Sequence, residues 1–527
     1  MTLVDSLISR TADRNAGRIA IRYRDKALSY GELSQSVTAT ARALRALELE
    51  RQDRVAVFLE KRFETISALF GAATAGGVFV PVNPLLKPEQ IGHILRDCNV
   101  RVLITSTPRF EPLRDVLAQC PDLRHVVLVD PAPTPAFAHA PLIAWNDFLA
   151  GATTTPTHPV IDQDMAAILY TSGSTGKPKG VVLSHRNLVA GAASVCQYLE
   201  NTPEDRILSV LPLSFDYGLS QLTTAFTVGA SVTLLNYLLP RDVIVAVARG
   251  GITGLAAVPP LWIQLAELDW PAAAAQSLRY LTNSGGRMPR PTVDALRRKL
   301  PHTKAFLMYG LTEAFRSTYL PPDELDRRPD SIGKAIPNAE IMVVRPDGTP
   351  SAPNEPGELV HRGVHVSLGY WNDPDKTAER FKPVPGQPAG IPVTEIAVWS
   401  GDTVRADEDG FLYFVGRRDE MIKTSGYRVS PTEVEEVVYA TGLVGEVVAV
   451  GAPHPVLGEC VVVIATPPAG KPWQADALLA ACKRDLPAFM VPAAIHRRDT
   501  LPRNANGKID RAQLAKEHAV TAPQGGI

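Results

Sequence analysis

Cysteine is scarce in this sequence, and the few cysteines present form no pattern. The 527 residues contain five cysteines, an odd number, and no two of them form a Cys-x-x-Cys pair. They are scattered along the chain as Cys98, Cys120, Cys196, Cys460 and Cys482. A disulfide framework or a cysteine zinc site would need closer, paired spacings. We therefore expect a protein of the reducing cytoplasm without a zinc site.

Excess charge of one sign and long apolar runs are also missing. Lys plus Arg number 54 and Asp plus Glu number 55, which leaves a net charge of −1. This balance argues against non-specific nucleic-acid binding as the main role, because that role needs a basic surface. The most apolar stretch, residues 207–240, is interrupted by Pro212, Gly218 and Gly229, and Asp216 is its only charge. We expect no membrane span, since a span needs ~20 predominantly apolar residues.

Short apolar runs alternate with helical patterns along the chain. RVAVFLE at 54–60 precedes the helical pattern FETISALFGAATAGG, and RVLITST at 101–107 and HVVLVD at 125–130 follow. Continuous apolar runs of this kind are typical of parallel strands that are covered by helices on both faces. The pattern predicts an α/β fold with mostly parallel sheets.

A change of pattern near residue 417 predicts a domain boundary. Residues 395–417 read as two strands around a polar Asp/Gly turn. A helix over 431–441 then begins after Ser430, with a proline and acidic residues in its first turn. The remaining residues suffice for one small α+β domain. We expect a large N-terminal domain at 1–417 and a small C-terminal domain at 418–527.

The clearest chemical signal is the segment YTSGSTGKPKGVVLSH at 170–185, which follows the apolar run AAILY. Its first eleven residues hold four Ser/Thr hydroxyls, three glycines and two lysines. Glycines let backbone N–H groups approach an oxyanion, hydroxyls add donors and lysines add charge, so the segment suits a polyphosphate. It is not a Walker loop, because two residues instead of four separate Gly173 from Gly176, and Pro178 follows Lys177. The alternative is a polar surface loop.

The segment YTSGSTGKPKG resembles the signature of the adenylate-forming superfamily, which comprises acyl-CoA synthetases, adenylation domains of non-ribosomal peptide synthetases, and luciferases. Further matches follow in the family's order: ALSYGEL (27–33), TAGGVFVPVNP (74–84), MYGLTEA (308–314), WSGD (399–402), GRRDEMIKTSGYRVS (416–430), LPAFMVP (486–492) and PRNANGKIDR (502–511). FDYGL and YGLTEAFRS look most like stand-alone prolyl-adenylating enzymes and exosortase-associated AMP-forming acyl-CoA ligases.

The resemblance implies a reaction and its cofactors. Enzymes of this superfamily use ATP and Mg²⁺ to convert a carboxylic acid into an acyl-adenylate with release of pyrophosphate. A thiol, from coenzyme A or from the phosphopantetheine of a carrier protein, then takes the acyl group. A small mobile C-terminal domain brings a catalytic lysine to the site, and its hinge falls near Asp419 here.

The resemblance also implies roles for residues that match the motifs. The implied catalytic residues are Lys508, Glu313 and Thr312, with Glu313 as the Mg²⁺ ligand. The implied ATP-binding residues are Thr171, Ser172, Gly173, Ser174, Thr175, Gly176, Lys177, Gly285, Gly286, Met308, Tyr309, Asp402 and Arg417. The implied substrate-binding residues are Phe215, Asp216 and Gly310, and the implied thiolation and hinge residues are Asp419, Lys423 and Gly426.

Each of these residues also has an ordinary structural interpretation. Glu313 could open a helix, Asp402 could belong to a turn, and Lys508 could be a solvated lysine beside an Asn-Gly turn. Gly285 and Gly286 could form an ordinary glycine turn. The ordered set of motifs favours the catalytic interpretation.

Asp216 leaves the acid substrate open. A lone carboxylate among apolar residues needs a cation or several donors. One candidate is the α-ammonium group of an amino acid substrate, because adenylation domains for amino acids carry a similar Phe-Asp pair. The alternative is that Asp216 caps the following helix, in which case a plain aliphatic or aromatic acid is favoured.

Three other functions also stay open at this point. They are a luciferase-like oxygenase that uses the adenylate, a non-catalytic nucleotide-binding regulator on the same fold, and a kinase-like ATPase that releases ADP. Lys508, Glu313 and Asp402 argue against the regulator, because a sensor has no need of the C-terminal lysine.

Overall fold

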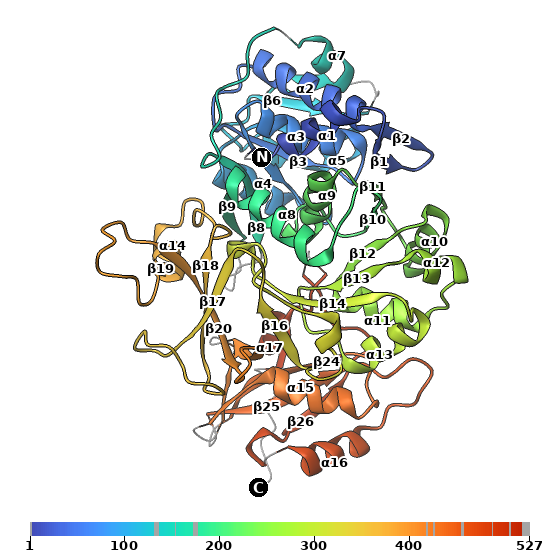
Figure 1. Ribbon diagram of the computed structural model, residues 1–527, viewed down its shortest axis with the longest axis vertical. Helices are drawn as coiled ribbons and strands as arrows, with labels where there is room; N and C mark the ends of the chain where they lie inside the picture. The colour runs from blue at the N-terminus through green and yellow to red at the C-terminus, as the bar shows by residue number, and fades with distance from the viewer. Residues whose placement is uncertain are drawn as a thin grey trace.

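The computed structural model describes residues 3–130, 136–152, 154–171, 178–417, 420–424, 427–454, 458–486, 488–504 and 507–518. Within these residues the strands form three sheets, with helices packed around them (Figure 1). The seven-stranded and 14-stranded sheets belong to the N-terminal part. The five-stranded sheet belongs to the C-terminal part, which lies at the bottom of Figure 1.

The seven-stranded sheet has six parallel strands and an antiparallel edge strand, β9. In spatial order its strands are β7 (Leu142–Ala144), β6 (His125–Leu128), β5 (Val100–Thr105), β3 (Arg54–Phe58), β4 (Val78–Pro81), β8 (Met165–Thr171) and β9 (Lys179–Ser184). The runs expected at 54–60, 101–107 and 125–130 are strands of this sheet. All four residues of β4 are buried, as expected for a parallel strand covered on both faces.

The 14-stranded sheet joins a parallel half to an antiparallel half. The parallel strands are β1 (Ile19–Tyr23), β11 (Ser231–Leu234), β10 (Arg206–Ser209), β12 (Gly254–Ala257), β13 (Tyr280–Asn283) and β14 (Lys304–Tyr309), with β2 (Lys26–Ser29) antiparallel at the edge. The antiparallel strands are β15 (Thr318–Leu320), β16 (Ser331–Ala335), β21 (Leu412–Arg417), β20 (Ile396–Ala406), β18 (Gly357–Gly363), β17 (Ala339–Val344) and β19 (Phe381–Pro383). The two strands expected at 395–417 are β20 and β21.

The C-terminal sheet has five strands and two apolar faces. Its strands are β23 (Tyr427–Val429), β22 (Ile422–Thr424), β25 (Gly458–Ala465), β24 (Val447–His454) and β26 (Ala494–Arg497). Side chains alternate between faces along β24, so Val447 and Ala449 join one core and Val448 and Val450 join another. The expectation of an α/β fold with mostly parallel sheets and a small C-terminal domain is confirmed.

The helices cover these sheets. The α-helices are α1 (Ser6–Arg14), α2 (Tyr30–Ala46), α3 (Phe63–Thr74), α4 (Pro88–Asp97), α5 (Thr107–Phe110), α6 (Arg114–Leu117), α7 (Trp145–Ala150), α8 (His185–Leu199), α9 (Asp216–Val228), α10 (Pro240–Gly250), α11 (Pro259–Glu267), α12 (Ala272–Ser277), α13 (Arg290–Lys299), α14 (Pro374–Arg380), α15 (Pro431–Ala440), α16 (Ala475–Asp485) and α17 (Arg511–His518). The 3₁₀ turns are η1 (Glu111–Leu113), η2 (Thr312–Ala314), η3 (Pro322–Glu324) and η4 (Ala488–Met490).

Several helices begin where their sequences predict. The expected helix at 431–441 is α15, and the Ser430 side chain accepts a hydrogen bond from the Glu433 backbone N–H at its start. Ser29 and Glu32 form a reciprocal capping box at the start of α2. These local signals agree with the tertiary packing, which is how a sequence specifies one fold.

Two further observations concern the whole molecule. All five cysteines are free thiols and are buried. In the described part of the chain, no helix has both the length and the apolar character that are needed to cross a membrane.

Candidate active site

Three loops meet at the carboxyl ends of neighbouring parallel strands. The loop after β10 leads to Phe215 and Asp216, the loop after β13 contains Gly285, and the turn after β14 contains Thr312. Open parallel sheets bind ligands at the carboxyl ends of their strands, because the loops there converge. The fold therefore brings together residues that are far apart in the sequence.

Asp216 is buried at the start of α9, and its carboxylate faces the turn after β14. It is 5% exposed, and its Oδ1 accepts a hydrogen bond of 3.1 Å from the Thr312 hydroxyl. The N-cap of α9 is Phe215, whose side chain makes no cap hydrogen bond, so Asp216 is the first helical residue and not the cap. Burial raises the pKa of Asp216, while the charges of Arg316 and Lys508 and the Thr312 hydrogen bond act to lower it.

Lys508 reaches this site from the C-terminal part of the chain. Its Nζ lies 5.4 Å from the centroid of the Phe215 ring. Gly285 has a φ of +80°, and a Cβ added there would lie 3.2 Å from Cε of Lys508. A side chain at residue 285 would therefore be strained and would crowd the lysine. The structure places Lys508, Phe215 and Gly285 together, and Lys508 is close enough to Asp216 to interact with its charge.

Two hydrogen bonds close the turn that carries Lys508. The Lys508 backbone N–H donates to Oδ1 of Asn504, and the Asn504 backbone N–H donates to the carbonyl of Lys508. Gly507 has a φ of +78°. This turn carries a lysine that reaches the carboxyl ends of strands in the large sheet.

Residues 170–180, YTSGSTGKPKG, are called the phosphate-loop segment. Glu313 lies in the 3₁₀ turn η2 and is linked to β9, the strand at the end of this segment. The Tyr370 hydroxyl donates a hydrogen bond of 2.5 Å to the Glu313 carboxylate. Tyr370 also forms a bridge with Val181 of β9, and Nζ of Lys179 lies 5.9 Å from the Tyr370 ring centroid. Glu313 is thus close to the end of the segment that the sequence assigns to phosphates.

The phosphate-loop segment joins two antiparallel strands. Thr171 at the end of β8 pairs with Lys179 at the start of β9. A Walker loop instead leads from a strand into a helix, so the observed connection agrees with the sequence interpretation. The six assigned residues Ser172, Gly173, Ser174, Thr175, Gly176 and Lys177 lie outside the described residues.

Asp402 and Tyr309 form a second polar pair beside the same turn. The Tyr309 hydroxyl donates a hydrogen bond to Oδ2 of Asp402, which is 5% exposed. The Asp402 backbone N–H donates 3.0 Å to the Ser400 hydroxyl, and Asp402 lies opposite Arg417 in the pairing of β20 with β21. The Arg417 side chain is outside the described part of the structure. Asp402 is therefore a buried strand residue with its carboxylate next to Tyr309, and not a turn residue.

The other residues that the sequence assigns to the site are Met308, Gly286, Lys423, Asp419 and Gly426. The Tyr198 hydroxyl donates to Sδ of Met308, and the Gly286 carbonyl accepts from the Asn283 side chain. Lys423 lies in β22, and nothing is described of its side chain. Asp419 and Gly426 lie outside the described residues.

The sequence analysis missed Arg316, which is 2% exposed and lies against the assigned residues. A Cβ added to Gly310 would lie 2.9 Å from Cα of Arg316, so only glycine fits at residue 310. The Arg316 guanidinium donates a hydrogen bond of 2.9 Å to the Ser284 hydroxyl. The only available signal was the position of an arginine two residues after the motif MYGLTEA.

These residues suit a magnesium–nucleotide complex. Mg²⁺ prefers one or two carboxylates together with phosphate oxygens, and Glu313 supplies a carboxylate near the phosphate-loop segment. The Asp402 carboxylate can accept from ribose hydroxyls. Gly285 and Gly310 allow close approach between these groups, because a side chain at either residue would crowd Lys508 or Arg316.

Comparison with known proteins identifies the family. Residues 8–371 match the family described as AMP-binding enzyme, and residues 433–508 match the AMP-binding enzyme C-terminal domain. Indoleacetate–CoA ligase of Aromatoleum aromaticum is 31% identical over 517 residues, with 95% of each chain covered. The solved structure of O-succinylbenzoate coenzyme A synthetase of Bacillus subtilis, in complex with ATP and magnesium ion, is 27% identical with a TM-score of 0.81, and the match covers 97% of this chain and 99% of that one.

A similar match occurs within a much longer protein. One of the linear gramicidin synthase subunits of Brevibacillus parabrevis is 29% identical over 528 residues, which is 99% of this chain and 6% of the length of that relative. This chain therefore spans only a small part of the synthase that it resembles.

The chain belongs to the family of AMP-binding enzymes. The predicted membership in the adenylate-forming superfamily is confirmed. The oxygenase and the non-catalytic regulator are not favoured.

Proposed function

We propose that this protein activates a small carboxylic acid with ATP and transfers the acyl group to the thiol of coenzyme A or of a carrier protein's phosphopantetheine. The observation that supports this proposal best is the position of Lys508. A lysine near the end of the chain lies beside Phe215 and Gly285, at the carboxyl ends of the parallel strands. A structural lysine has no reason to be there, whereas adenylate formation needs a cation at this place.

In the first half-reaction a carboxylate oxygen of the acid attacks the α-phosphorus of ATP. A new O–P bond forms, the bond to the bridging oxygen of the leaving group breaks, and pyrophosphate departs with that bond's electron pair. Catalysis of such a displacement depends mainly on alignment and charge stabilisation. Lys508 neutralises charge between the carboxylate and the α-phosphate, and the Thr312 hydroxyl contacts the α-phosphate. Glu313 would hold Mg²⁺, which when bound would neutralise charge on the phosphate oxygens.

The remaining assigned residues hold the nucleotide. Asp402 and Arg417 bind the ribose, and the Tyr309 ring and the backbone at Gly285 and Gly286 border the adenine. We assign residues 171–177 to the β- and γ-phosphates and Met308 to the nucleotide from the motifs in which they occur. This arrangement is supported by the pairing of Tyr309 with Asp402 and by the closeness of Glu313 to Lys179 through Tyr370.

The second half-reaction uses the C-terminal domain in another position. We place the domain boundary between 417 and 418, with Asp419 as the hinge and with Lys423 and Gly426 on the face used when the thiol attacks. The thiolate attacks the acyl carbon, the C–O bond to AMP breaks, and AMP leaves with the electron pair. The C-terminal sheet is separate from the large sheet, and this separation supports the division.

Asp216 supports an α-amino acid as the substrate. Its carboxylate is buried at the site and is not the helix cap that the alternative interpretation requires. The α-ammonium group of an amino acid would provide the opposite charge, and Phe215 and Gly310 border the same space. The interaction with Thr312 orients the Asp216 carboxylate.

The proposed function is tested with Lys508→Ala. We expect ATP–pyrophosphate exchange to fall by about 100-fold or more, because a preorganised cation at the developing charge is lost. Thiol capture of a synthetic acyl-adenylate should remain near the wild-type rate. Lys483→Ala is the matched control, because Lys483 is an exposed lysine of the same domain. Equal loss in both half-reactions, or no loss in exchange, would contradict the proposed role.

A further inference from the structure

Arg316 is a buried cation whose guanidinium is only partly satisfied within the described part of the protein. It donates a hydrogen bond to Ser284, and its Cζ lies 4.8 Å from the centroid of the Tyr217 ring. Its Nε is buried and has no hydrogen-bond partner among the described residues. Among the same residues, the guanidinium forms no ion pair with a carboxylate within 4.0 Å. Burying a guanidinium in this way is costly for a protein that has no use for it.

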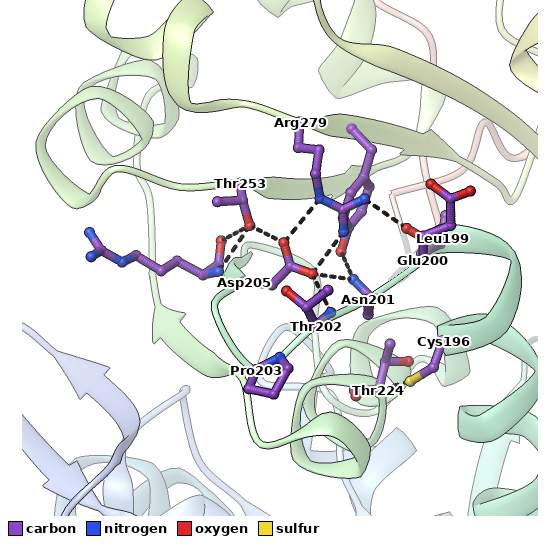
Figure 2. A network of polar contacts seen from close by, with 12 residues as sticks. Cys196, Leu199, Glu200, Asn201, Thr202, Pro203, Asp205, Thr224, Thr253 and Arg279 are labelled. Atoms are coloured by element: carbon purple, nitrogen blue, oxygen red, sulfur yellow. Dashed lines mark hydrogen bonds and ion pairs between the residues drawn. The ribbon is translucent and has the colours of Figure 1, made fainter.

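Arg279 shows how the same chain satisfies a structural arginine. Its guanidinium donates to both carboxylate oxygens of Asp205, at 2.7 and 3.2 Å, and to the Leu199 carbonyl at 2.9 Å (Figure 2). Asp205 also accepts from the Thr253 hydroxyl and from the Asn201 side chain. Arg279 is thus part of a complete network, although it is more exposed than Arg316. The contrast indicates that Arg316 is kept for a ligand.

The backbone before Arg316 is strained. Phe315 has a φ of +59° and a ψ of −70°, which is unfavourable for a bulky residue with a Cβ. Its ring packs so closely against α8 that a Cβ at Gly191 would lie 2.5 Å from the ring. Strain of this kind costs on the order of 1–3 kcal/mol and collects at functional sites. Here the strained residue immediately precedes the buried arginine.

Aromatic rings and polar groups together surround Arg316, and they border the acyl site. Its NH1 lies 3.3 Å from the position that a Cβ on Gly310 would occupy, so the guanidinium lies directly beside that glycine. Tyr217, which Arg316 covers, follows Asp216 in α9 and shares a hydrogen bond of 2.6 Å with Thr282. Arg316 and Asp216 are close enough to interact electrostatically. A pocket for a plain fatty or aryl acid would be lined by apolar side chains instead.

We propose that Arg316 determines specificity by binding a second carboxylate of the acid substrate, so that the enzyme activates a dicarboxylic acid, with or without an α-amino group. This inference rests on the proposed function. A guanidinium fork matches a carboxylate in two hydrogen bonds, and that match supplies the anionic partner absent from the described surroundings of Arg316. Lys508 then neutralises charge on the carboxylate that reacts, while Arg316 binds the second carboxylate, which does not react.

Two roles for Arg316 have to be distinguished by experiment. In the proposed role it contacts the substrate, and its loss changes the choice among acids. In a merely structural role it supports Tyr217 and offsets the charge of Asp216, and its loss changes stability or affects all acids equally. Selectivity between two acids is therefore the decisive measurement, and thermal stability is the second.

The test uses ATP–pyrophosphate exchange by the full chain. Dicarboxylic acids of three to six carbons, and their α-amino counterparts, are each compared with the monomethyl ester at the distal carboxylate. We expect at least one diacid to exceed its ester by about 100-fold in kcat/KM, because the ester leaves a buried charge unpaired. Arg316→Met should reduce this ratio to below about 10-fold, and Arg316→Lys should retain part of it. Arg279→Lys is the control, which should lower Tm and leave the ratio unchanged.

Several results would overturn the inference. Exchange that is supported only by monocarboxylic acids, or equally by diacids and esters, would refute it and leave the proposed function intact. An unchanged ratio in Arg316→Met together with a lower Tm would assign Arg316 a structural role. If Arg316→Met does not fold, the wild-type ratio and the Arg316→Lys ratio decide. Exchange with no acid of any class would refute the proposed function itself, and the inference with it.

Discussion

Lys61 offers a prediction that can be worked out quantitatively. It lies between β3 and α3, is 8% exposed, and its Nζ donates to the carbonyls of Val210 and Leu211. These carbonyls belong to the segment that leads from β10 to Asp216. Burial lowers the pKa of Lys61 from 10.5 to about 8. The cause is desolvation, since burial disfavours the charged form of a lysine.

The lowered pKa makes stability depend on pH. Below pH 8 both the folded and the unfolded chain hold the proton, and the folded chain bears the full cost of the buried charge. Between pH 8 and 10.5 the folded chain loses the proton while the unfolded chain keeps it, so stability rises with pH. The full effect is about 3 kcal/mol, and about 2 kcal/mol of it develops between pH 7 and 9.5.

The assay compares wild type with Lys61→Met by calorimetry or thermal fluorescence at pH 7 and 9.5. Other titrating groups are common to both proteins and cancel in the difference. At ~2 cal/mol/K of unfolding entropy per residue, about 2 kcal/mol corresponds to a Tm change of about 2 °C for this chain. Wild type should therefore gain about 2 °C on the variant as the pH rises. Lys26→Met, at an exposed position, should show no such trend, and a difference that is flat for Lys61→Met would refute the reasoning.

Two further predictions concern the site. Gly285→Ala should slow adenylate formation by about 10-fold or more and leave thiol capture of a preformed adenylate nearly unchanged, because the new Cβ crowds Lys508. Gly348→Ala has a similar positive φ in open space and should keep wild-type exchange activity, so equal losses in the two variants would contradict the crowding argument. Asp216→Ala should reduce pyrophosphate exchange with α-amino acids by about 10- to 100-fold relative to their desamino analogues, since a charge-assisted hydrogen bond is lost. Equal losses for amino and desamino acids would rule out the ammonium partner.

The parallel strands of the seven-stranded sheet could be predicted from local pattern. The runs at 54–60, 101–107 and 125–130 are strands because continuous apolar residues at that length suit strands buried on both faces. The antiparallel half was harder to predict. Most residues of β17 are partly buried and show no clear alternation, and the pairing of β16 with β21 joins distant segments. Pairings of that kind depend on tertiary context more than on local sequence.

The site was predictable in its parts and not in its assembly. The motifs supplied Thr312, Glu313 and Lys508, but a motif cannot say that Thr312 bonds to Asp216 or that Lys508 lies beside Gly285. The role of Arg316 was not predicted from the sequence for a related reason. An arginine shortly after a turn is usually exposed. The burial of Arg316 follows from the positive φ of Phe315, which the sequence pattern does not indicate.

Lys61 and Arg316 are two buried cations that differ in kind. Lys61 has carbonyls as its partners, and its lowered pKa reflects the cost of keeping it charged. Arg316 cannot lose its proton to escape that cost, because a guanidinium stays charged in proteins. A buried arginine whose Nε has no partner among the described residues must therefore be compensated by something else. Asp216 is near enough to contribute, but its charge also interacts with Lys508. A substrate that carries both an ammonium group and a second carboxylate would satisfy both residues at once, which neither residue does for the other in the described structure.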